Sequence, residues 1–520
     1  MGDSQLTPYL LDKSLLQYTH RCTEVALAPN ATSPDRIRAR LALEFFVSLF
    51  DPAVDSERKC LETFKNHLVA LNNGNSTKIA PLSDLSISPS SNKLSSVQQV
   101  LSLPDTLSEI LSHISPLSVD GRTTFHSAAL VSRSFHYAAD KTLWKTPRDL
   151  DTVEQQVHFA FGAAISAALG ESLGNQVRGL RIRRMSGGWN ERLIVKIAQL
   201  CPQVDTLLLH CGDVEDGEDP ITQDFVDVIH TVLSSLPNVE DLSLVKFSYT
   251  PPVGQLKLPK DAHVPFRQLV SLRLYDFGWY WPAIRQGLGF SLKSLDFGLL
   301  PQLSSEELIS LARQTSVVNL AMSSALELEP LREFVFKGLI EHLHIKQFFD
   351  HDEKYAEELI SIATASLSSL KAFTLSGVEV GRHELELFEA FHGPLEEIGV
   401  QIREDVSSED AIGMICRLVK SKRQSLKVIQ IDFEGTFELK PTEELINNLA
   451  DCPVLERILI PFASTTGISS TSVDALLKRC LKLELTWSLE SLCEGNELYE
   501  REYKMKLELK ESDDDGRLGA

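Results

Sequence analysis

The residue pair with the clearest potential for chemistry is His342 and His344, which stand two positions apart in the segment IEHLHIKQF. Residues at i and i+2 of a β-strand point to the same face, so the two imidazoles could bind one metal ion. A zinc site needs at least three protein ligands, and no third ligand stands at a suitable spacing. We therefore expect no metal and no other cofactor at this pair.

The sequence also lacks complete forms of several enzyme and cofactor motifs. The sequence has no H-E-x-x-H and no G-x-x-x-x-G-K-[ST], and GLG at 287–289 lacks the third glycine of a dinucleotide-binding turn. In the acidic loop 212–220, Gly212 stands where an EF-hand needs its first calcium ligand. We expect a chain that does no chemistry itself, with a hydrolase or transferase on an unrecognised α/β domain as the alternative.

The charge and the cysteines restrict the partners and the compartment. The 520-residue chain has a net charge of −21, which disfavours general binding to nucleic acid or to an anionic membrane surface. The start MGDSQLTPYLLDK has no basic segment before an apolar run, so we expect no signal peptide. The eight cysteines show no C-x-x-C spacing, which favours free thiols and a location in the cytoplasm, the nucleus or both.

One pattern recurs between about residues 177 and 487: a hydrophobic residue, two variable residues, and then an apolar–x–apolar pair. Alternation of this kind predicts a strand with one buried face. The copies stand about 28 residues apart on average. The first apolar residues of the eleven pairs are Leu180, Leu207, Leu242, Leu272, Leu295, Leu320, Leu343, Phe373, Ile398, Ile429 and Ile458. A weaker twelfth copy is LKLELTW at 481–487.

Amphipathic helices fill the intervals between these predicted strands. The clearest helices are predicted at 191–200, 222–236, 305–314, 355–367, 409–421, 442–450 and 472–480. One strand and one helix per repeat is typical of a solenoid. The pattern resembles leucine-rich repeats of the long, helix-containing type, although the Asn or Cys after each strand is mostly missing. A doubly wound α/β fold or an eight-fold barrel is the alternative, but eleven units are too many for the barrel.

These patterns divide the chain into five predicted parts. We expect an α/β solenoid of leucine-rich-repeat-like strand–helix repeats, preceded by a small all-α domain and N-terminal helices. The predicted parts are an N-terminal helical region (1–75), a Ser- and Asn-rich flexible linker (76–100), a helical domain (101–148), the solenoid (149–492) and an acidic C-terminal tail (493–520).

The helical domain contains two apolar stripes. In SLPDTLSEILSHISPL (102–117), leucines and isoleucines recur at helical spacing after Pro104, a residue suited to the first turn of a helix. The segment TTFHSAALVSRSFHYAADKTLWKTP (123–147) carries the second stripe. One interpretation is a small helical domain whose stripes form its own core. The other is a domain that also presents some of these side chains to a partner.

The two stripes resemble the F-box family. The family pattern begins with Leu-Pro, has a Val-(Cys/Ser)-Arg-x-(Trp/Phe) core and closes on Asp-x-x-Leu-Trp. The matching elements are Leu103-Pro104, the segment 131–135 and the segment 140–144. Phe135 stands where many members have Trp, and the middle of the unit is slightly longer and more polar than usual.

This resemblance implies a partner and a role. F-box domains dock on a Skp-type adaptor, which bridges to a cullin ubiquitin ligase, so the chain would be a non-catalytic substrate-recognition subunit. A protein-binding repeat scaffold outside a ligase is the alternative. The adaptor-binding residues that the resemblance implies are Leu103, Pro104, Leu107, Ile110, Leu111, Ile114, Val131, Phe135, Leu143 and Trp144.

A target protein would bind the repeats. The outward residues of the strands are varied and polar, and the stretch YDFGWYWP (275–282) concentrates aromatic side chains, which are typical interface anchors. The alternative is that these rings fill gaps between neighbouring repeats. The candidate target-binding residues are Arg273, Tyr275, Trp279, Tyr280, Trp281, His342 and His344.

Overall fold

The structure is a computed structural model that describes most of the chain between residues 13 and 483. Outside the description are residues 1–12, 29–30, 51–54, 74–106, 108–110, 112–118, 130–132, 148, 169–172, 184–190, 212–222, 246–265, 276, 278–279, 299–303, 324–327, 347–352, 367, 392, 404–405, 434–438, 463–467, 481–482 and 484–520. The predicted linker and acidic tail therefore lie outside the described residues, as does the twelfth repeat copy apart from Leu483.

The chain divides into two compact units. Unit 1 comprises Met1–Leu269 and Trp279–Leu288, and unit 2 comprises Val270–Gly278 and Gly289–Ala520. The strands of unit 1 are β1 (Gly179–Arg183), β2 (Thr206–His210) and β3 (Asp241–Val245). Its helices are α2 (Lys13–Leu27), α3 (Ser33–Leu49), α4 (Asp55–Asn73), α7 (Val119–Ala129), α8 (Arg133–Lys145), α9 (Val153–Ala168), α10 (Glu191–Leu200), α11 (Gln223–Ser235) and α12 (Trp281–Gly287), with 3-10 turns η2 (Leu173–Gln176) and η3 (Phe266–Gln268).

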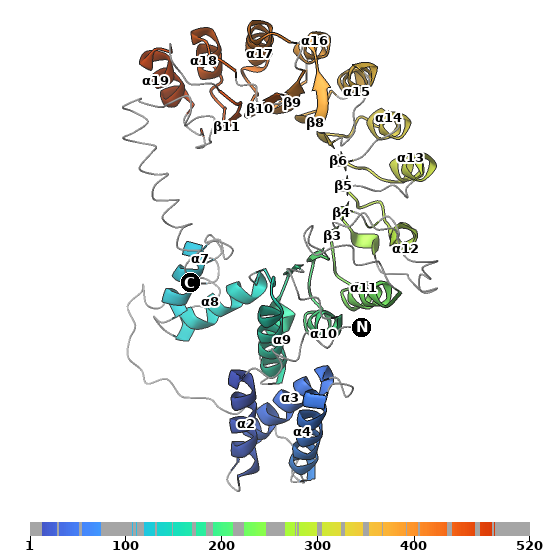
Figure 1. The fold of residues 1–520 in the computed structure, drawn as a ribbon, viewed down its shortest axis with the longest axis vertical. Helices are drawn as coiled ribbons and strands as arrows, with labels where there is room; N and C mark the ends of the chain where they lie inside the picture. The colour runs from blue at the N-terminus through green and yellow to red at the C-terminus, as the bar shows by residue number, and fades with distance from the viewer. Residues whose placement is uncertain are drawn as a thin grey trace. The chain divides into compact units, whose positions relative to one another are not determined.

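Unit 2 continues the alternation of strands and helices. Its strands are β4 (Ser271–Tyr275), β5 (Ser294–Gly298), β6 (Asn319–Ser323), β7 (His342–Lys346), β8 (Ala372–Val380), β9 (Glu397–Ile402), β10 (Val428–Phe433) and β11 (Arg457–Leu459). Its helices are α13 (Ser305–Gln314), α14 (Leu328–Phe336), α15 (Glu353–Ser366), α16 (Arg382–Ala390), α17 (Ser408–Lys422), α18 (Glu443–Ala450) and α19 (Ser470–Arg479). These helices form a row along one side of the strands (Figure 1).

The strands of the described residues are parallel and follow the order of the chain, from β1 to β11. In unit 1 the predicted anchors Leu180, Leu207 and Leu242 pair in register. In unit 2 the predicted anchors from Leu272 to Ile458 form one in-register row across eight strands. Every anchor is at most 1% exposed. The predicted strand–helix repeat is therefore confirmed.

Side-chain alternation along each strand makes one buried and one open face. In β7, Leu343 and Ile345 are buried beneath the helices, whereas His342 and Lys346 are exposed. The helices supply the other half of the core. In α13, for example, Leu308, Leu311 and Ala312 are buried at helical spacing. We call the side of β4–β11 that carries the intervening polar side chains the open face.

Charged side chains also link successive repeats in unit 2. Where the strands begin, Lys371 Nζ lies 2.7 Å from Glu341 Oε2, and Lys427 Nζ lies 2.6 Å from Glu396 Oε2. These four residues form a row of alternating sign, one residue per repeat, which we call the entry ladder. Opposite charges on neighbouring strands favour one register over a slipped one.

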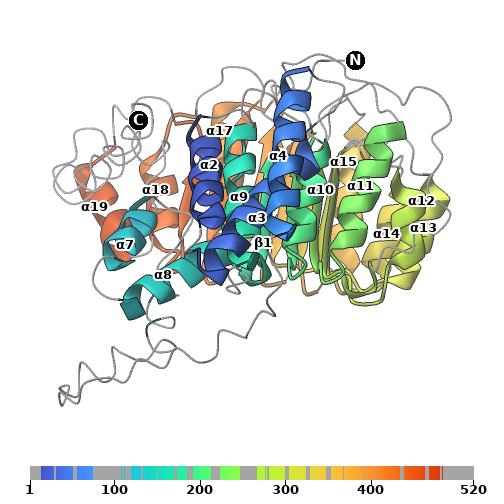
Figure 2. The same ribbon diagram turned by 90° about the horizontal axis from the view of Figure 1, so that it is seen from below.

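The N-terminal helices form a separate core within unit 1. Helix α3 packs against α2, α4 and α9 (Figure 2). The N-cap of α3 is Thr32. Thr32 Oγ1 accepts from the N–H of Asp35, and the Asp35 carboxylate accepts from the N–H of Thr32. A reciprocal capping box needs an acidic residue three positions after the N-cap, and Asp35 stands three positions after Thr32.

Candidate protein-interaction surfaces

The predicted helical domain contains a small apolar core. Leu107 and Leu111 are 0% and 3% exposed and pack with Phe125 of α7 and with Ala138 and Ala139 of α8. Phe135 and Leu143 are partly buried against the same core. The prediction that Leu107 and Leu111 face a partner directly is therefore wrong, because both side chains are already buried within the chain. Leu103, Pro104, Ile110, Ile114 and Val131 lie outside the described residues.

Trp144, also predicted to contact the adaptor, packs toward the first repeats. Its ring lies 5.2 Å from that of Phe159 on α9, and a side chain at Gly162 would contact its outer edge. The indole therefore attaches α8 to α9. Trp144 remains partly exposed, and its contact with an adaptor stays a prediction.

Residues 149–151 form the edge next to β1. Leu150 bridges to Ile182, and the Asp149 carboxylate lies 3.1 Å from the Arg183 guanidinium. Asp149 also lies 3.9 Å from Arg181, and Asp151 lies 3.9 Å from Arg183. The carboxylates of Asp149 and Asp151 therefore partly neutralise the charges of Arg181 and Arg183, the two outward arginines of β1.

The open face carries a polar cluster on β4 and β5. Asp296 accepts from Arg273 Nε at 2.7 Å and from the Tyr275 hydroxyl at 3.0 Å. The Tyr275 ring occupies the space over Gly298, where a Cβ would come within 2.1 Å of the ring. Arg273 and Tyr275 are among the predicted target-binding residues, whereas Asp296 and Gly298 are not. Both stand 23 positions later, at the same place in the next repeat, so alignment of the copies could have found them.

The two histidines of β7 occupy different environments on the open face. His342 is exposed at the start of the strand, whereas His344 is partly buried. Burial is the main cause of a lowered pKa for His344, and the Asp296 carboxylate opposes it. The described residues contain no group of three or more His, Cys, Asp or Glu placed to hold a metal ion. His344 therefore offers the open face a mainly neutral hydrogen-bonding group near neutral pH.

The aromatic stretch 275–282 is mostly part of the core. Phe277 and Tyr280 are fully buried and Trp281 is 2% exposed, whereas Trp279 lies outside the described residues. The Tyr280 hydroxyl lies 3.2 Å from His230 Nδ1 on α11, and burial raises the pKa of Tyr280. The prediction of Tyr280 and Trp281 as target anchors is wrong. Tyr280 packs beside α11, and Trp281 is the first residue of α12.

Buried cysteine thiols and a G-x-S-x-G segment are candidate nucleophiles. Burial raises the pKa of the Cys201 thiol to about 12 and that of Cys480 to about 11, so neither is an activated thiolate. The segment GESLG (170–174) matches G-x-S-x-G, but it follows helix α9 and leads into the turn η2. A nucleophile elbow instead connects a strand to a helix. These groups give no support to an acyl-transfer site.

No family model matches the chain, and no curated protein matches it. Among solved structures, the chain is similar to the leucine-rich repeat-containing protein LegL7 from Legionella pneumophila. The two share 14% identity over 59% of this chain and 90% of that chain, with a TM-score of 0.33. Within the described residues, no helix combines the length and apolar composition that crossing a bilayer requires. The chain's own strands and helices show a parallel strand–helix repeat of the solenoid type.

Proposed function

We propose that the chain is the substrate-recognition subunit of a Skp-cullin-F-box ubiquitin ligase. In this proposal, residues 101–148 dock on the Skp-type adaptor and the repeats hold a protein target. The observation that carries the proposal is the F-box-like pattern between Leu103 and Trp144, together with the compact core around Leu107 and Phe125. Leu107, Leu111, Phe135 and Leu143, which belong to the pattern, lie in this core or pack against it.

The small size of this unit supports a partner-dependent role. A helical unit of about 48 residues buries little apolar surface by itself. A unit of this kind gains stability when further apolar side chains are buried against a partner. Each fully buried Leu, Ile or Phe contributes about 1.5–3 kcal/mol. A few such anchors are enough for stable docking after the costs of association.

The open face of unit 2 supports target binding by the repeats. Its exposed side chains come from a rigid row of parallel strands, and they differ in charge and shape from one repeat to the next. The cluster of Arg273, Tyr275 and Asp296 is held by hydrogen bonds before any partner binds. Such preorganisation lowers the entropy lost on binding. In this role the chain does no chemistry and acts by holding a target near the ubiquitin-charged enzyme.

A second candidate is a protein-binding repeat scaffold that works outside a ligase. The observation that favours it is the in-register row of anchor residues, which requires no adaptor. The two candidates share the target surface and differ only in whether residues 101–148 bind a Skp-type adaptor.

Co-expression of the full chain with a Skp-type adaptor, followed by size-exclusion chromatography, separates the two candidates. We expect a one-to-one complex with the wild type and none with Leu103→Ala/Pro104→Ala. A matched control is Pro81→Ala/Leu82→Ala, which removes the same two residue types from the predicted linker and should leave the complex intact. Well-folded wild-type protein that forms no complex would exclude the ligase role.

A further inference from the structure

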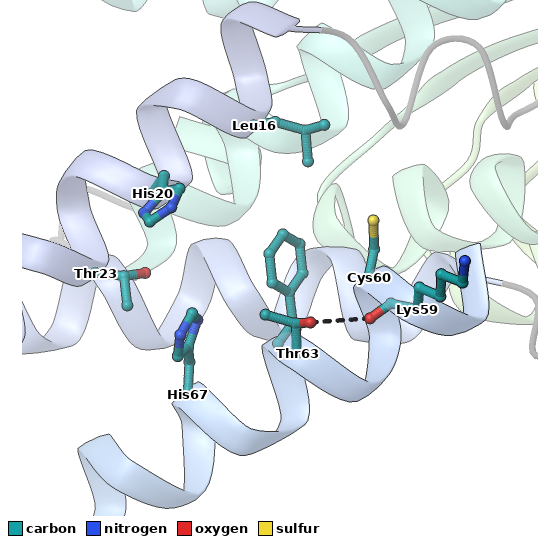
Figure 3. A pocket seen from close by; sticks show the side chains of 8 residues that line it. Leu16, His20, Thr23, Lys59, Cys60, Thr63 and His67 are labelled. Atoms are coloured by element: carbon teal, nitrogen blue, oxygen red, sulfur yellow. Dashed lines mark hydrogen bonds between the residues drawn. The ribbon is translucent and has the colours of Figure 1, made fainter. Parts of the chain in front are cut away.

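A groove between α2 and α4 lies in the N-terminal region, to which the sequence assigns no function. Its volume is about 280 Å³, and both helices pack on α3. The side chains of α2 and α4 face each other across it (Figure 3). The lining residues are Leu16, His20, Thr23, Lys59, Cys60, Thr63, Phe64 and His67.

The floor of this α2–α4 groove is apolar and already ordered. The Phe64 ring lies 5.6 Å from that of Phe46 and 5.7 Å from that of Phe50, so α3 fixes its position. The hydroxyls of Thr23 and Thr63 donate to carbonyl oxygens one turn earlier, at 2.8 Å and 3.0 Å. A ligand therefore meets apolar surface without having to order it, which reduces the cost of binding.

The length of the groove matches the spacing of helix anchors. On α2 the lining residues Leu16, His20 and Thr23 stand at i, i+4 and i+7, a rise of about 10.5 Å. Leu27, four positions further along the same stripe, is 47% exposed. An amphipathic helix that docks in a groove presents apolar side chains at the same i, i+4 and i+7 spacing. The groove thus accommodates one row of side chains from a single helix.

The charge of the lining selects the kind of helix. The eight lining residues include one lysine, Lys59, and two histidines, His20 and His67, and none is acidic. The carboxylate of Glu24 lies beside the lining, 3.9 Å from His20. This basic lining belongs to a chain with a net charge of −21. A positive charge at one place on an acidic chain favours, at that place, a partner that carries negative charge.

We propose that the α2–α4 groove binds an acidic amphipathic helix of a partner protein. Apolar side chains of the helix occupy the floor at Leu16 and Phe64, and its carboxylates lie beside Lys59 and the two histidines. The proposal does not depend on adaptor binding by residues 101–148, because the groove is formed by α2 and α4 alone.

Fluorescence anisotropy with the full chain and three labelled 16-residue peptides tests the proposal. The first peptide has leucines at i, i+4 and i+7 with glutamates around them, the second replaces the glutamates by lysines, and the third scrambles the first. We expect the first peptide to bind at least about tenfold more tightly than the other two.

Two matched pairs of variants locate the binding. Thr63→Trp fills the groove, whereas Asn66→Trp places the same ring on an exposed position of α4 outside it. Lys59→Glu reverses a lining charge, whereas Lys65→Glu reverses an exposed charge of the same helix. We expect Thr63→Trp and Lys59→Glu each to weaken binding of the acidic peptide at least about tenfold, and each control to change it less than about twofold.

Several results would overturn the proposal. One is acidic-peptide binding that is no tighter than that of the scrambled peptide, and another is binding that survives both Thr63→Trp and Lys59→Glu. Circular dichroism shows whether the Thr63→Trp variant is folded. If that variant is not folded, the binding measured with Lys59→Glu tests the proposal instead. Groove-dependent binding of decanoate without the peptide would assign the groove to a small apolar anion. Self-association that Thr63→Trp abolishes would assign it to a second copy of the chain.

Discussion

Tyr275 and Tyr280 lie five positions apart and have different roles. Tyr280 is fully buried, with its hydroxyl 3.2 Å from His230, and its ring belongs to the core of unit 1. Tyr275 lies on the open face of unit 2, where it covers Gly298 and donates to Asp296. At the residue scale, the aromatic stretch therefore contributes one surface tyrosine, and the rest of its described rings contribute packing.

The buried role of Tyr280 predicts a large loss of stability on truncation. Tyr280→Ala should reduce the free energy of unfolding by about 3–5 kcal/mol because it leaves a cavity. Tyr280→Phe removes only the hydroxyl and should cost about 1 kcal/mol. Urea unfolding followed by tryptophan fluorescence measures both changes. Phe290→Ala is the control, because Phe290 is 82% exposed and should have little effect. An unchanged unfolding midpoint for Tyr280→Ala would contradict the buried role and support an exposed position for Tyr280.

The contact between Tyr275 and Gly298 predicts a coupled pair. Gly298→Ala places a methyl group where the Tyr275 ring lies, so the ring must move and its bond to Asp296 breaks. We expect a loss of about 1–3 kcal/mol in stability. In a Tyr275→Ala background the same change should cost much less, because no ring opposes the methyl group. Thermal unfolding of the four proteins in a double-mutant cycle measures this coupling. Additive effects would show that the ring does not depend on Gly298.

At the scale of elements, the strands were the most predictable part. All eleven anchors were placed from the alternation of apolar residues, because burial on one face imposes a period of two. Long amphipathic helices such as α10 and α13 were predicted with the observed bounds. In both kinds of element, the periodic pattern follows directly from which side chains must be buried.

Three helices were missed for identifiable reasons. Helix α12 begins within the aromatic stretch, α14 has Pro330 in its first turn, and α16 follows β8 after the single residue Gly381. The inward turn of Tyr280 was equally hidden, because a short aromatic loop has no period that reveals its buried side. Local sequence patterns fix the face of a strand, but tertiary contacts decide where a loop side chain points.

The entry ladder predicts a pH dependence at the element scale. The hydrogen bond from Lys371 is the main cause that lowers the pKa of Glu341 below its ordinary value of 4.5. A lowered pKa in the folded state stabilises the fold above pH 4.5, and this contribution is lost as the pH falls through the lowered value. Lys371→Met should therefore lower the thermal midpoint at pH 6, and the difference from wild type should shrink toward pH 3.

A charge-matched control completes this experiment. Lys440→Met removes an exposed lysine outside the entry ladder and should show no such trend. A difference between Lys371→Met and wild type that stays constant from pH 6 to pH 3 would mean that the Glu341–Lys371 pair contributes nothing to stability.

At the scale of the whole molecule, we propose separate binding functions for separate parts of the chain. The described residues between Leu107 and Leu143 include a small helical core, and the open face of unit 2 presents a preorganised polar surface. An adaptor subunit needs two such surfaces, because its effect is to raise the local concentration of one partner near another. We propose that the helical unit within residues 101–148 binds the Skp-type adaptor.

Hydrogen–deuterium exchange of the full chain, with and without a Skp-type adaptor, tests this proposal. We expect slower exchange in peptides from residues 101–145 when the adaptor is added, and unchanged exchange in β4–β11. The protection should disappear in Leu103→Ala/Pro104→Ala and persist in Pro81→Ala/Leu82→Ala. Exchange that is unaffected in residues 101–145, or slowed only in the repeats, would contradict the account.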